Sequence, residues 1–398
     1  MEKKINQLFY KNLLILIILF LPFQNNVLQA SSEPIIRVLI KKDKNLRVRS
    51  DSNIPLLISG NQFFNKRIKG LTITDKFNKK VLFFDKAKDK LYDLNNNSFL
   101  IRSNDKRGVW VGDKRYSGII NIILKDNKIY VVNKLRIENY LSSVVGSEMP
   151  HKWPLEALKA QAIASRTYAL KKKGNSMFDI DSTQKDQVYN GLESRTIKTQ
   201  KAVRLTRSLV ITHENKLINA LFHSSSASRT ENSEDVWSNK YDYLRSVKDF
   251  DKDNPKLIWN KSFTKDELKN LFPILGGLEK IKVLQKSKTG RIKSLEIIGE
   301  NGSKEILGKD FRGKMKLNST LFNYSFIKPN LDGAGRSNQG LINSSQTYLL
   351  ISGKGSGHGV GMSQWGAKYM ASKGARAEQI LKHFYKGIVV KPFRKIYK

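Results

Sequence analysis

The chain of 398 residues contains no cysteine. This absence excludes thiol nucleophiles, disulfide bonds and zinc sites built on thiolates. His223 and His358 lack acidic or thiol partners at the spacing of a metal site, so we expect neither a metal nor another cofactor. The chain also lacks a Gly-x-Ser-x-Gly elbow, which argues against a serine hydrolase.

Acidic residues are scarce as well. The chain has 35 Asp and Glu against 72 Lys and Arg, and its net charge is +37. Such a charge attracts polyanions. The basic residues are spread along the whole chain and form no single stripe with interleaved aromatic residues, so we do not expect nucleic acid as a partner.

Only one segment is strongly apolar, and it lies near the N-terminus. Three lysines precede the apolar run Leu13–Phe23, and the small residue Ala30 ends the polar stretch that follows. This layout predicts a secretory signal peptide over residues 1–30, and a protein that is soluble in the periplasm or cell wall after cleavage. An uncleaved anchor is the alternative, although a membrane span needs about 20 residues. Because an exported protein does not meet cytoplasmic nucleic acid, we expect the positive charge to act on the anionic cell envelope.

The rest of the chain alternates between strand-like and helix-like patterns, which predicts an α+β protein. Clusters of Asn, Asp, Gly and Lys separate short β-rich runs in the N-terminal region. Strands are predicted at residues 35–40, 81–84, 119–124, 129–132, 209–212, 217–222, 281–284, 292–298 and 347–351. Helices are predicted at residues 154–172, 265–271 and 377–385, and long polar loops at 223–236 and 328–345.

Glu148 lies in a Gly-Ser-Glu-Met-Pro turn shortly before the helix that opens at Pro154. A glutamate before a helix often caps it or complements its dipole. Pro150 and the Trp153-Pro154 pair separate Glu148 from the first helical turn, which weakens that interpretation. Glu148 therefore needs another explanation.

Two cations follow on the predicted helix. Lys159 and Arg166 are seven residues apart, so they lie nearly on one line along it. A solvated basic edge is the usual explanation, but this helix is otherwise apolar enough to be mostly buried. The sequence leaves open whether desolvation raises the pKa of Glu148, as a general acid requires, or whether the two cations lower it.

Two loops carry most of the other candidate residues. The loop 223–236 is rich in Ser, Arg, Glu and Asn and ends beside Trp237, so we expect it outside the core, as a wall that binds carbohydrate. The loop 355–366 has alternating glycines, which let a ligand approach the backbone closely. It lacks the Gly-Lys-Ser/Thr of a phosphate-binding loop, and we expect His358 to be a site residue rather than a core histidine.

Several blocks of the chain resemble the signature of the SpoIID/LytB family. They are Tyr140-Leu141, Val144-Val145, Ser147–Pro150, Trp153–Ala162, Ala164–Ala169, Gln187–Tyr189, Phe222–Ser224, Thr230–Asn232, Asp235–Trp237 and Gly357–Ala367. The resemblance spans about residues 136–387 and is weaker over 251–345. It implies a SpoIID-like core of mixed sheet and helices at 131–250 that residues 346–398 complete. A β-rich region at 31–130 precedes this core, and 251–345 form an α/β accessory segment.

The resemblance also implies a protein directed at peptidoglycan. SpoIID enzymes are lytic transglycosylases that cut glycan strands without stem peptides, and LytB relatives are described as enhancers of a cell-wall amidase. Glu148 falls on the catalytic acid of the family, and Lys159 and Arg166 fall on positions tied to activity. Some members bind zinc through Cys and His, but this chain has no Cys, so zinc is not carried over.

We therefore expect a lytic transglycosylase that uses Glu148 as general acid and base between N-acetylmuramic acid and N-acetylglucosamine. One carboxylate suffices because the sugar's own 6-hydroxyl closes a 1,6-anhydro ring, unlike the paired carboxylates of other glycosidases. The alternative is a non-catalytic amidase enhancer or wall-binding module, with a cell-wall amidase as possible partner besides the glycan strands. The residues expected to bind substrate are Lys159, Arg166, Gln187, Tyr189, His223, Ser224, Ser225, Thr230, Glu231, Asn232, His358 and Gln364.

Overall fold

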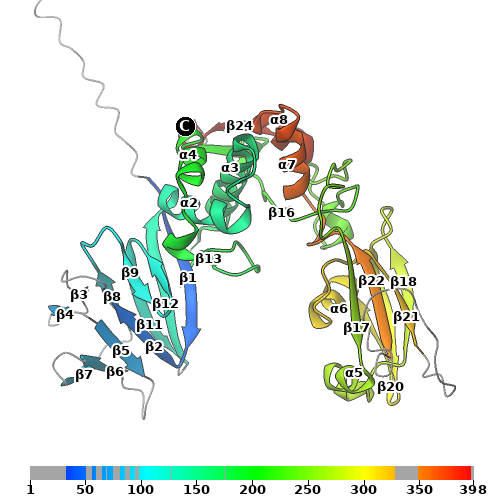
Figure 1. Ribbon diagram of the computed structural model, residues 1–398, viewed down its shortest axis with the longest axis horizontal. Coiled ribbons are helices and arrows are strands. Elements are labelled where there is room, and N and C mark those ends of the chain that lie inside the picture. The colour runs from blue at the N-terminus through cyan, green and yellow to red at the C-terminus, as the bar shows by residue number, and fades with distance from the viewer. Residues whose placement is uncertain are drawn as a thin grey trace, which may run out of the picture. The chain divides into compact units, whose positions relative to one another are not determined.

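The computed structural model describes residues 33–395 except for residues 51–55, 60–64, 69, 75–80, 86–89, 95–97, 127, 175 and 328–347. The protein has α+β architecture with several sheets, as the sequence predicts (Figure 1). The signal peptide expected at residues 1–30 and the loop expected at 328–345 lie outside the described residues. Within the described ranges, no helix is long and apolar enough to cross a membrane.

Two sheets make up the N-terminal region. The first has the order β13 (Ile180–Asp181), β1 (Ile35–Asp43), β12 (Lys128–Arg136), β11 (Ile119–Lys125), β8 (Ser98–Arg102), β3 (Leu56–Ser59) and β4 (Asn65–Ile68). The second has the order β10 (Lys114–Tyr116), β9 (Val109–Val111), β2 (Asn45–Arg49), β5 (Gly70–Thr74), β6 (Val81–Asp85) and β7 (Lys90–Leu94). Alternate side chains such as Ile120 and Ile122 are buried because successive residues of a strand face opposite sides. The four strands predicted here are confirmed as β1, β6, β11 and β12.

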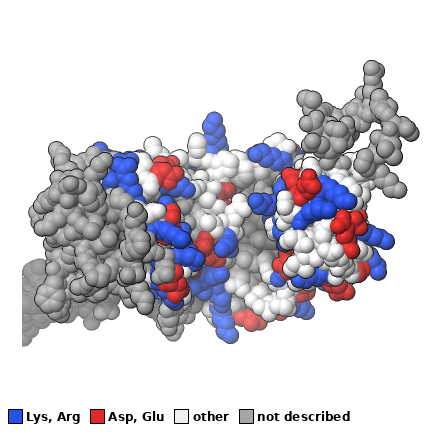
Figure 2. Space-filling view, turned by 90° about the horizontal axis from the view of Figure 1, so that it is seen from below, with Lys and Arg blue, Asp and Glu red and all other residues white. Residues whose placement is uncertain are grey.

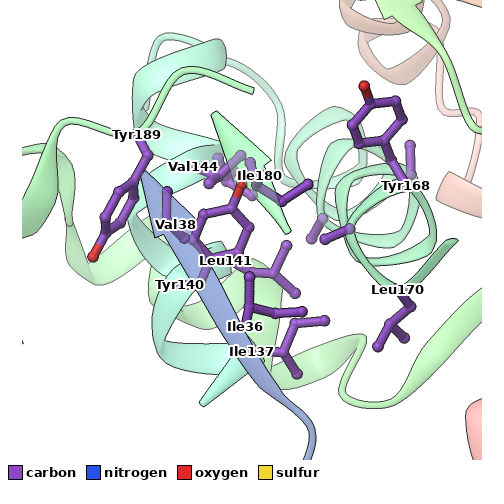
Figure 3. Close-up of a cluster of buried hydrophobic side chains, with 14 of the residues drawn as sticks. Ile36, Val38, Ile137, Tyr140, Leu141, Val144, Tyr168, Leu170, Ile180 and Tyr189 are labelled. Carbon is purple, nitrogen blue, oxygen red and sulfur yellow. The ribbon is translucent and has the colours of Figure 1, made fainter. Parts of the chain in front are cut away.

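Helix α2 (Ile137–Glu148) begins directly after β12 and packs on the first sheet. Figure 3 shows Tyr140 and Leu141 of α2 beside Ile36 and Val38 of β1, all of them buried. Helix α3 (Leu155–Lys172) confirms the helix predicted at 154–172, and it is buried on almost every side. Helix α4 (Ile197–Leu205) packs against both.

No helix is predicted over residues 137–148, so α2 corrects the expected surroundings of Glu148. Glu148 is the last residue of α2 and does not belong to a turn that leads into α3. Ile137, Tyr140 and Val144 recur at the three- and four-residue spacing of a buried helix face. The neighbouring serines, valines and Gly146 have low helix propensity, which hides this pattern, and burial against the sheet compensates for it.

The C-terminal segment packs on α3 and pairs with earlier strands. Helices α7 (Gln364–Ser372) and α8 (Ala377–Phe384) both contact α3. The strands involved are β14 (Leu209–His213), β15 (Lys216–Leu217), β16 (Phe222–His223), β23 (Met362–Ser363) and β24 (Val389–Pro392). β24 pairs with β14, and β23 runs parallel to β16. The single strand predicted at 217–222 is instead two short ones, β15 and β16.

Residues 258–326 and 349–354 have a hydrophobic core of their own. Its sheets are β17 (Ile258–Phe263), β22 (Leu349–Lys354) and β21 (Phe322–Phe326), and β18 (Lys280–Lys286), β19 (Ile292–Gly299) and β20 (Gly302–Leu307). Helices α5 (Lys265–Leu271) and α6 (Gly308–Lys314) accompany them. The helix predicted at 265–271 is confirmed as α5, which Thr264 and Glu267 cap reciprocally.

Gly146 lies where α2 packs closely against the 3-10 helix η1 (Gly191–Ser194). A Cβ atom at Gly146 would lie 1.9 Å from the carbonyl oxygen of Ser194. We expect Gly146→Ala to lower the free energy of unfolding by about 1–3 kcal/mol because it overpacks this contact, although alanine is the better helix former. Urea unfolding measures the change.

Gly313→Ala in α6 is the matched control. A Cβ atom at Gly313 meets no other atom within 4 Å, so this variant should gain about 0.5–1 kcal/mol from the lower entropy of its unfolded chain. Equal free energies of unfolding for the two variants would contradict the close contact between α2 and η1.

Candidate functional site

The candidate site is built around the carboxyl group of Glu148, at the end of α2. Its Oε1 atom accepts a hydrogen bond of 2.7 Å from the backbone N–H of Val188. Its Oε2 atom accepts a longer bond, of 3.4 Å, from Nε2 of Gln364, the first residue of α7. Three segments that are far apart in the sequence therefore meet at one half-buried acid.

Burial controls the protonation of Glu148. It raises the pKa of Glu148 to about 7, against the lowering effect of the bonds from Val188 and Gln364. The position of the carboxyl group at the C-terminal end of α2 acts in the same direction as burial, because the negative end of a helix dipole disfavours a carboxylate. Glu148 therefore holds its proton up to about pH 7, which is the state that a general acid needs.

The buried side-chain amide of Gln161 lies beside that of Gln364. The Nε2 atom of Gln364 also lies 3.5 Å from Oε1 of Gln161, and Gln161 in turn donates to the hydroxyl of Ser165 at 3.0 Å. Gln161 and Ser165 are fully buried in α3. This chain of hydrogen bonds fixes the direction from which Gln364 approaches the acid.

Gln187 and Tyr189, which were expected to bind substrate, are buried on either side of Val188. Gln187 accepts a hydrogen bond of 2.9 Å from the hydroxyl of Tyr140 and donates to a backbone carbonyl of α3. The hydroxyl of Tyr189 donates to Asn133 at 2.8 Å. These contacts hold the Val188 N–H in place, so they support a positioning role, and substrate binding by the two side chains stays a prediction.

Lys159 and Arg166 of α3 have carboxylate partners of their own. Lys159 pairs with Glu156 at 2.8 Å. Arg166 is 1% exposed, pairs with Glu138 of α2 at 2.6 Å and donates to a backbone carbonyl of β14. Neither contributes to the pKa of Glu148, which decides the question that the sequence left open. Substrate binding by Lys159 and Arg166 stays a prediction, and the contacts of Arg166 are those of a structural ion pair.

The loop 223–236 is more buried than its polarity predicts, so the expectation that it lies outside the core is wrong. Its buried members are His223, Ser225, Ser226, Thr230, Glu231 and Ser233. Hydrogen bonds make this burial possible. The hydroxyls of Ser225 and Ser226 donate to Asp251 and Asp249, and the hydroxyl of Thr230 accepts from a backbone N–H. Asn232, which is half-buried, also accepts a backbone hydrogen bond.

This loop lies against the glycine-rich loop 355–366. β16 pairs with β23, and an isolated bridge joins Glu231 to Val360. The carbonyl oxygen of Ser224 accepts a hydrogen bond of 3.1 Å from the N–H of Trp365. The structure thus brings together the two loops that the sequence analysis singled out, and it brings the second of them to Glu148 through Gln364.

His223 and His358 lie close together where the loops meet. Their ring centroids are 5.5 Å apart, and the Trp237 ring lies 5.1 Å from His358. Gly357 makes room for this arrangement, because a Cβ atom there would lie 2.7 Å from the Cβ atom of His223. Burial lowers the pKa of His358 to about 3 and that of His223 well below its usual range. Both rings are therefore neutral hydrogen-bonding groups near pH 7.

Glu231 is another acid with a raised pKa in this region. It is 1% exposed, and burial raises its pKa to about 7. The hydroxyl of Thr289 donates to Glu231 Oε1, and Arg291 lies near enough to oppose the rise in pKa. In the part of the chain that the structure describes, Glu231 Oε2, Arg291 Nε and Nη1, and His223 Nε2 have no hydrogen-bond partner. These groups form a buried polar cluster beside the glycine-rich loop.

Sequence reasoning missed Val188, Gln161 and Arg291. Val188 acts through its backbone N–H, which no side-chain pattern reports. Gln161 lies between Leu158 and Ser165 at helical spacing, so a polar residue on a buried stripe is the signal that identifies it. Arg291 belongs to the segment that the family resemblance covers weakly.

The positive charge of the chain is not concentrated on the face shown in Figure 2. Lys and Arg side chains are scattered there among Asp and Glu. This distribution agrees with the even spread of basic residues along the sequence. Among the residues that the structure describes, no three His, Cys, Asp or Glu side chains are grouped as a metal ion would require.

Several known proteins are similar to this chain in sequence. A family model described as stage II sporulation protein matches residues 125–213. Stage II sporulation protein D of Bacillus amyloliquefaciens is 34% identical over 65% of this chain and 74% of its own length. An uncharacterized protein of Brachyspira hyodysenteriae is 32% identical over 71% of this chain and 74% of its own. The amidase enhancer of Bacillus subtilis is 32% identical over 62% of this chain and 39% of its own length.

The raised pKa of Glu148 makes stability depend on pH. Folded Glu148 keeps its proton up to about pH 7, whereas the unfolded residue loses it near pH 4.5, so the fold loses stability as pH rises through this window. We expect Glu148→Gln to raise the free energy of unfolding by up to about 3 kcal/mol at pH 8 and by almost nothing at pH 4.5. Urea unfolding at both pH values measures this. A constant difference would contradict the raised pKa.

Arg166→Leu separates a structural role from substrate binding. The variant leaves Glu138 without its buried partner, so we expect the free energy of unfolding to fall by about 3–5 kcal/mol. Lys159→Met breaks a more exposed pair, so it should lower the free energy of unfolding by less than about 1 kcal/mol. An Arg166→Leu protein that unfolds like the wild type but no longer binds glycan strands would contradict the structural role.

Proposed function

Because this chain belongs to the SpoIID/LytB family, we propose that it is an exported lytic transglycosylase that cleaves peptidoglycan strands without stem peptides. One observation carries the proposal. Glu148 is a half-buried acid with a pKa of about 7, oriented by two hydrogen bonds. An acid that can be protonated or ionised near neutral pH suits a reaction in which one group gives and then takes a proton.

In the first step Glu148 donates its proton to the glycosidic oxygen between N-acetylmuramic acid and N-acetylglucosamine. The bond from that oxygen to C1 of the muramic residue breaks, and the acetamide oxygen of the same residue assists at C1. Oε2 of Glu148 is the better proton donor, because its bond from Gln364 is long, whereas Val188 holds Oε1 at 2.7 Å.

In the second step the Glu148 carboxylate takes the proton from the 6-hydroxyl of the muramic residue. The oxygen of this hydroxyl displaces the acetamide oxygen from C1 and closes the 1,6-anhydro ring. The N–H groups of Val188 and Gln364 stabilise the carboxylate between the steps, since hydrogen bonds to a charged acceptor are the stronger ones. The proton has then returned to Glu148. No water and no second carboxylate take part, unlike the paired-carboxylate glycosidases.

The two polar loops supply the groups that we propose hold the sugar. Ser224, Asn232 and His358 are half-buried. Neutral His358 can donate to or accept from a hydroxyl or acetamide group, and Trp237 beside it offers a ring face. Export to the periplasm or cell wall, where peptidoglycan lies, is part of the same proposal.

A second candidate function is non-catalytic. The amidase enhancer of Bacillus subtilis is similar to most of this chain, which supports a glycan-binding protein that stimulates a cell-wall amidase. The two candidates share the same binding surface and differ in the chemistry at Glu148.

Incubation with strands stripped of stem peptides distinguishes the candidates. We expect the wild type to release 1,6-anhydro-ended products, detected by mass spectrometry, and Glu148→Gln to lower their yield at least about 100-fold, as loss of a general acid does. Glu378→Gln, at an exposed acid paired with Lys382, is the matched control and should cut like the wild type.

Two outcomes would contradict the proposal. Wild-type protein that binds the strands without forming anhydro products would exclude the reaction and leave the non-catalytic function. Equal yields from the wild type and Glu148→Gln would exclude the role of Glu148.

A further inference from the structure

A pair of tryptophans and one lysine lie together near Glu148. The rings of Trp153 and Trp365 meet edge to face, with centroids 4.9 Å apart. The ammonium group of Lys368 lies 4.2 Å from the centroid of the Trp365 ring and 5.6 Å from that of Trp153. All three side chains are half-buried, so part of each is open to solvent.

The position of this cluster follows from α7. Trp365 comes directly after Gln364, whose amide contacts Glu148. Lys368 is four residues after Gln364, so the two side chains lie on the same face of α7, one turn apart. Trp153 closes a short turn after Glu148, with its N–H bonded to the carbonyl oxygen of Pro150. The two tryptophans and Lys368 therefore lie on segments that adjoin Glu148 or its partner Gln364.

Lys368 differs in its partners from three cations of the neighbouring helix α3. Lys159, Arg166 and Lys172 each pair with a carboxylate. Within the described residues Lys368 forms no such ion pair, and its neighbours are neutral indole rings. Cation–π contacts hold the ammonium group in place without cancelling its charge. Lys368 is thus a positioned positive charge with no carboxylate of its own.

We propose that Trp153, Trp365 and Lys368 form the subsite for the sugar next to the cleaved bond, and that Lys368 binds the free lactyl carboxylate of an N-acetylmuramic acid residue. The inference rests on the proposed function. The indole rings contact the apolar face of the sugar, and the ammonium group pairs with the carboxylate at its edge. In a strand that carries stem peptides this carboxyl group is an uncharged amide, so Lys368 selects strands from which the peptides have been removed.

Binding measured without turnover tests the subsite. All variants carry Glu148→Gln, and the ligands are stripped glycan strands and the same strands with their lactyl carboxyl groups converted to primary amides. We expect Lys368→Met to weaken binding of the carboxylate strands about tenfold, since a charge-assisted pair contributes on the order of 1.5 kcal/mol. Binding of the amidated strands should be unchanged.

Lys373→Met is the matched control. Lys373 follows α7, lies over an aromatic ring as Lys368 does, and carries the same charge, but it is exposed and five residues farther from Gln364. The Lys373→Met variant should bind both kinds of strand with the same affinity as the Glu148→Gln parent. Trp365→Leu should weaken binding of both kinds of strand, because the ring contacts the sugar face in each. It should weaken binding of the carboxylate strands more, because the same ring holds the ammonium group of Lys368. Circular dichroism checks that each variant is folded.

The outcomes separate the subsite from the reaction. Equal affinities for Lys368→Met and Lys373→Met, or equal losses by Lys368→Met on both strands, would overturn the subsite. The cleavage assay with the wild-type protein tests the proposed reaction independently of these binding measurements. Absence of anhydro products together with a Lys368-dependent preference for carboxylate strands would overturn the proposed reaction and leave the subsite standing.

Discussion

The desolvated carboxyl group of Glu148, held between a backbone N–H and a side-chain amide, is the constraint on which the rest of the site depends. Burial alone would raise its pKa further, and the bonds from Val188 and Gln364 hold the value near 7. Each partner needs support of its own. Gln161 steadies Gln364, while Gln187 and Tyr189 steady the backbone of Val188. Tyr140 of α2 and Gln161 and Ser165 of α3 belong to the hydrogen-bond chains behind these two contacts.

A chain with a net charge of +37 must also keep its cations from ionising this acid. Lys159 is paired with Glu156 and Arg166 with Glu138, so each of these two cations of α3 has a carboxylate partner other than Glu148. Acidic residues are scarce, and several of them are placed as local partners of lysines and arginines. The excess of positive charge is thus compatible with a protonated acid, and Lys368 is left with neutral rings one helical turn from Gln364.

The glycine-rich loop joins the acid to the buried polar cluster. Its glycines are required by contact, because a Cβ atom at Gly359 would lie 2.9 Å from the guanidinium of Arg291 and one at Gly361 only 2.1 Å from a carbonyl oxygen. The same cluster connects the loop 223–236 to the accessory segment, through Thr289 to Glu231 and through Lys293 to Asp235. The accessory segment therefore supports the loops of the site as well as its own core.

The sequence by itself determined the α+β class, the family, helices α3, α5 and α8, and most of the strands that it predicted, because hydrophobic spacing and continuous motifs are local properties. Many other strands were not predicted. It also singled out Glu148 and Gln364, whose side chains are in contact in the structure. Only the tertiary structure decided that Glu148 ends a helix, that Arg166 pairs with Glu138, and that the loop 223–236 is buried. The pKa of Glu148 depends on segments 40 and 216 residues away, which remove water from the carboxyl group and donate its hydrogen bonds. Spacing along the chain does not report such contacts.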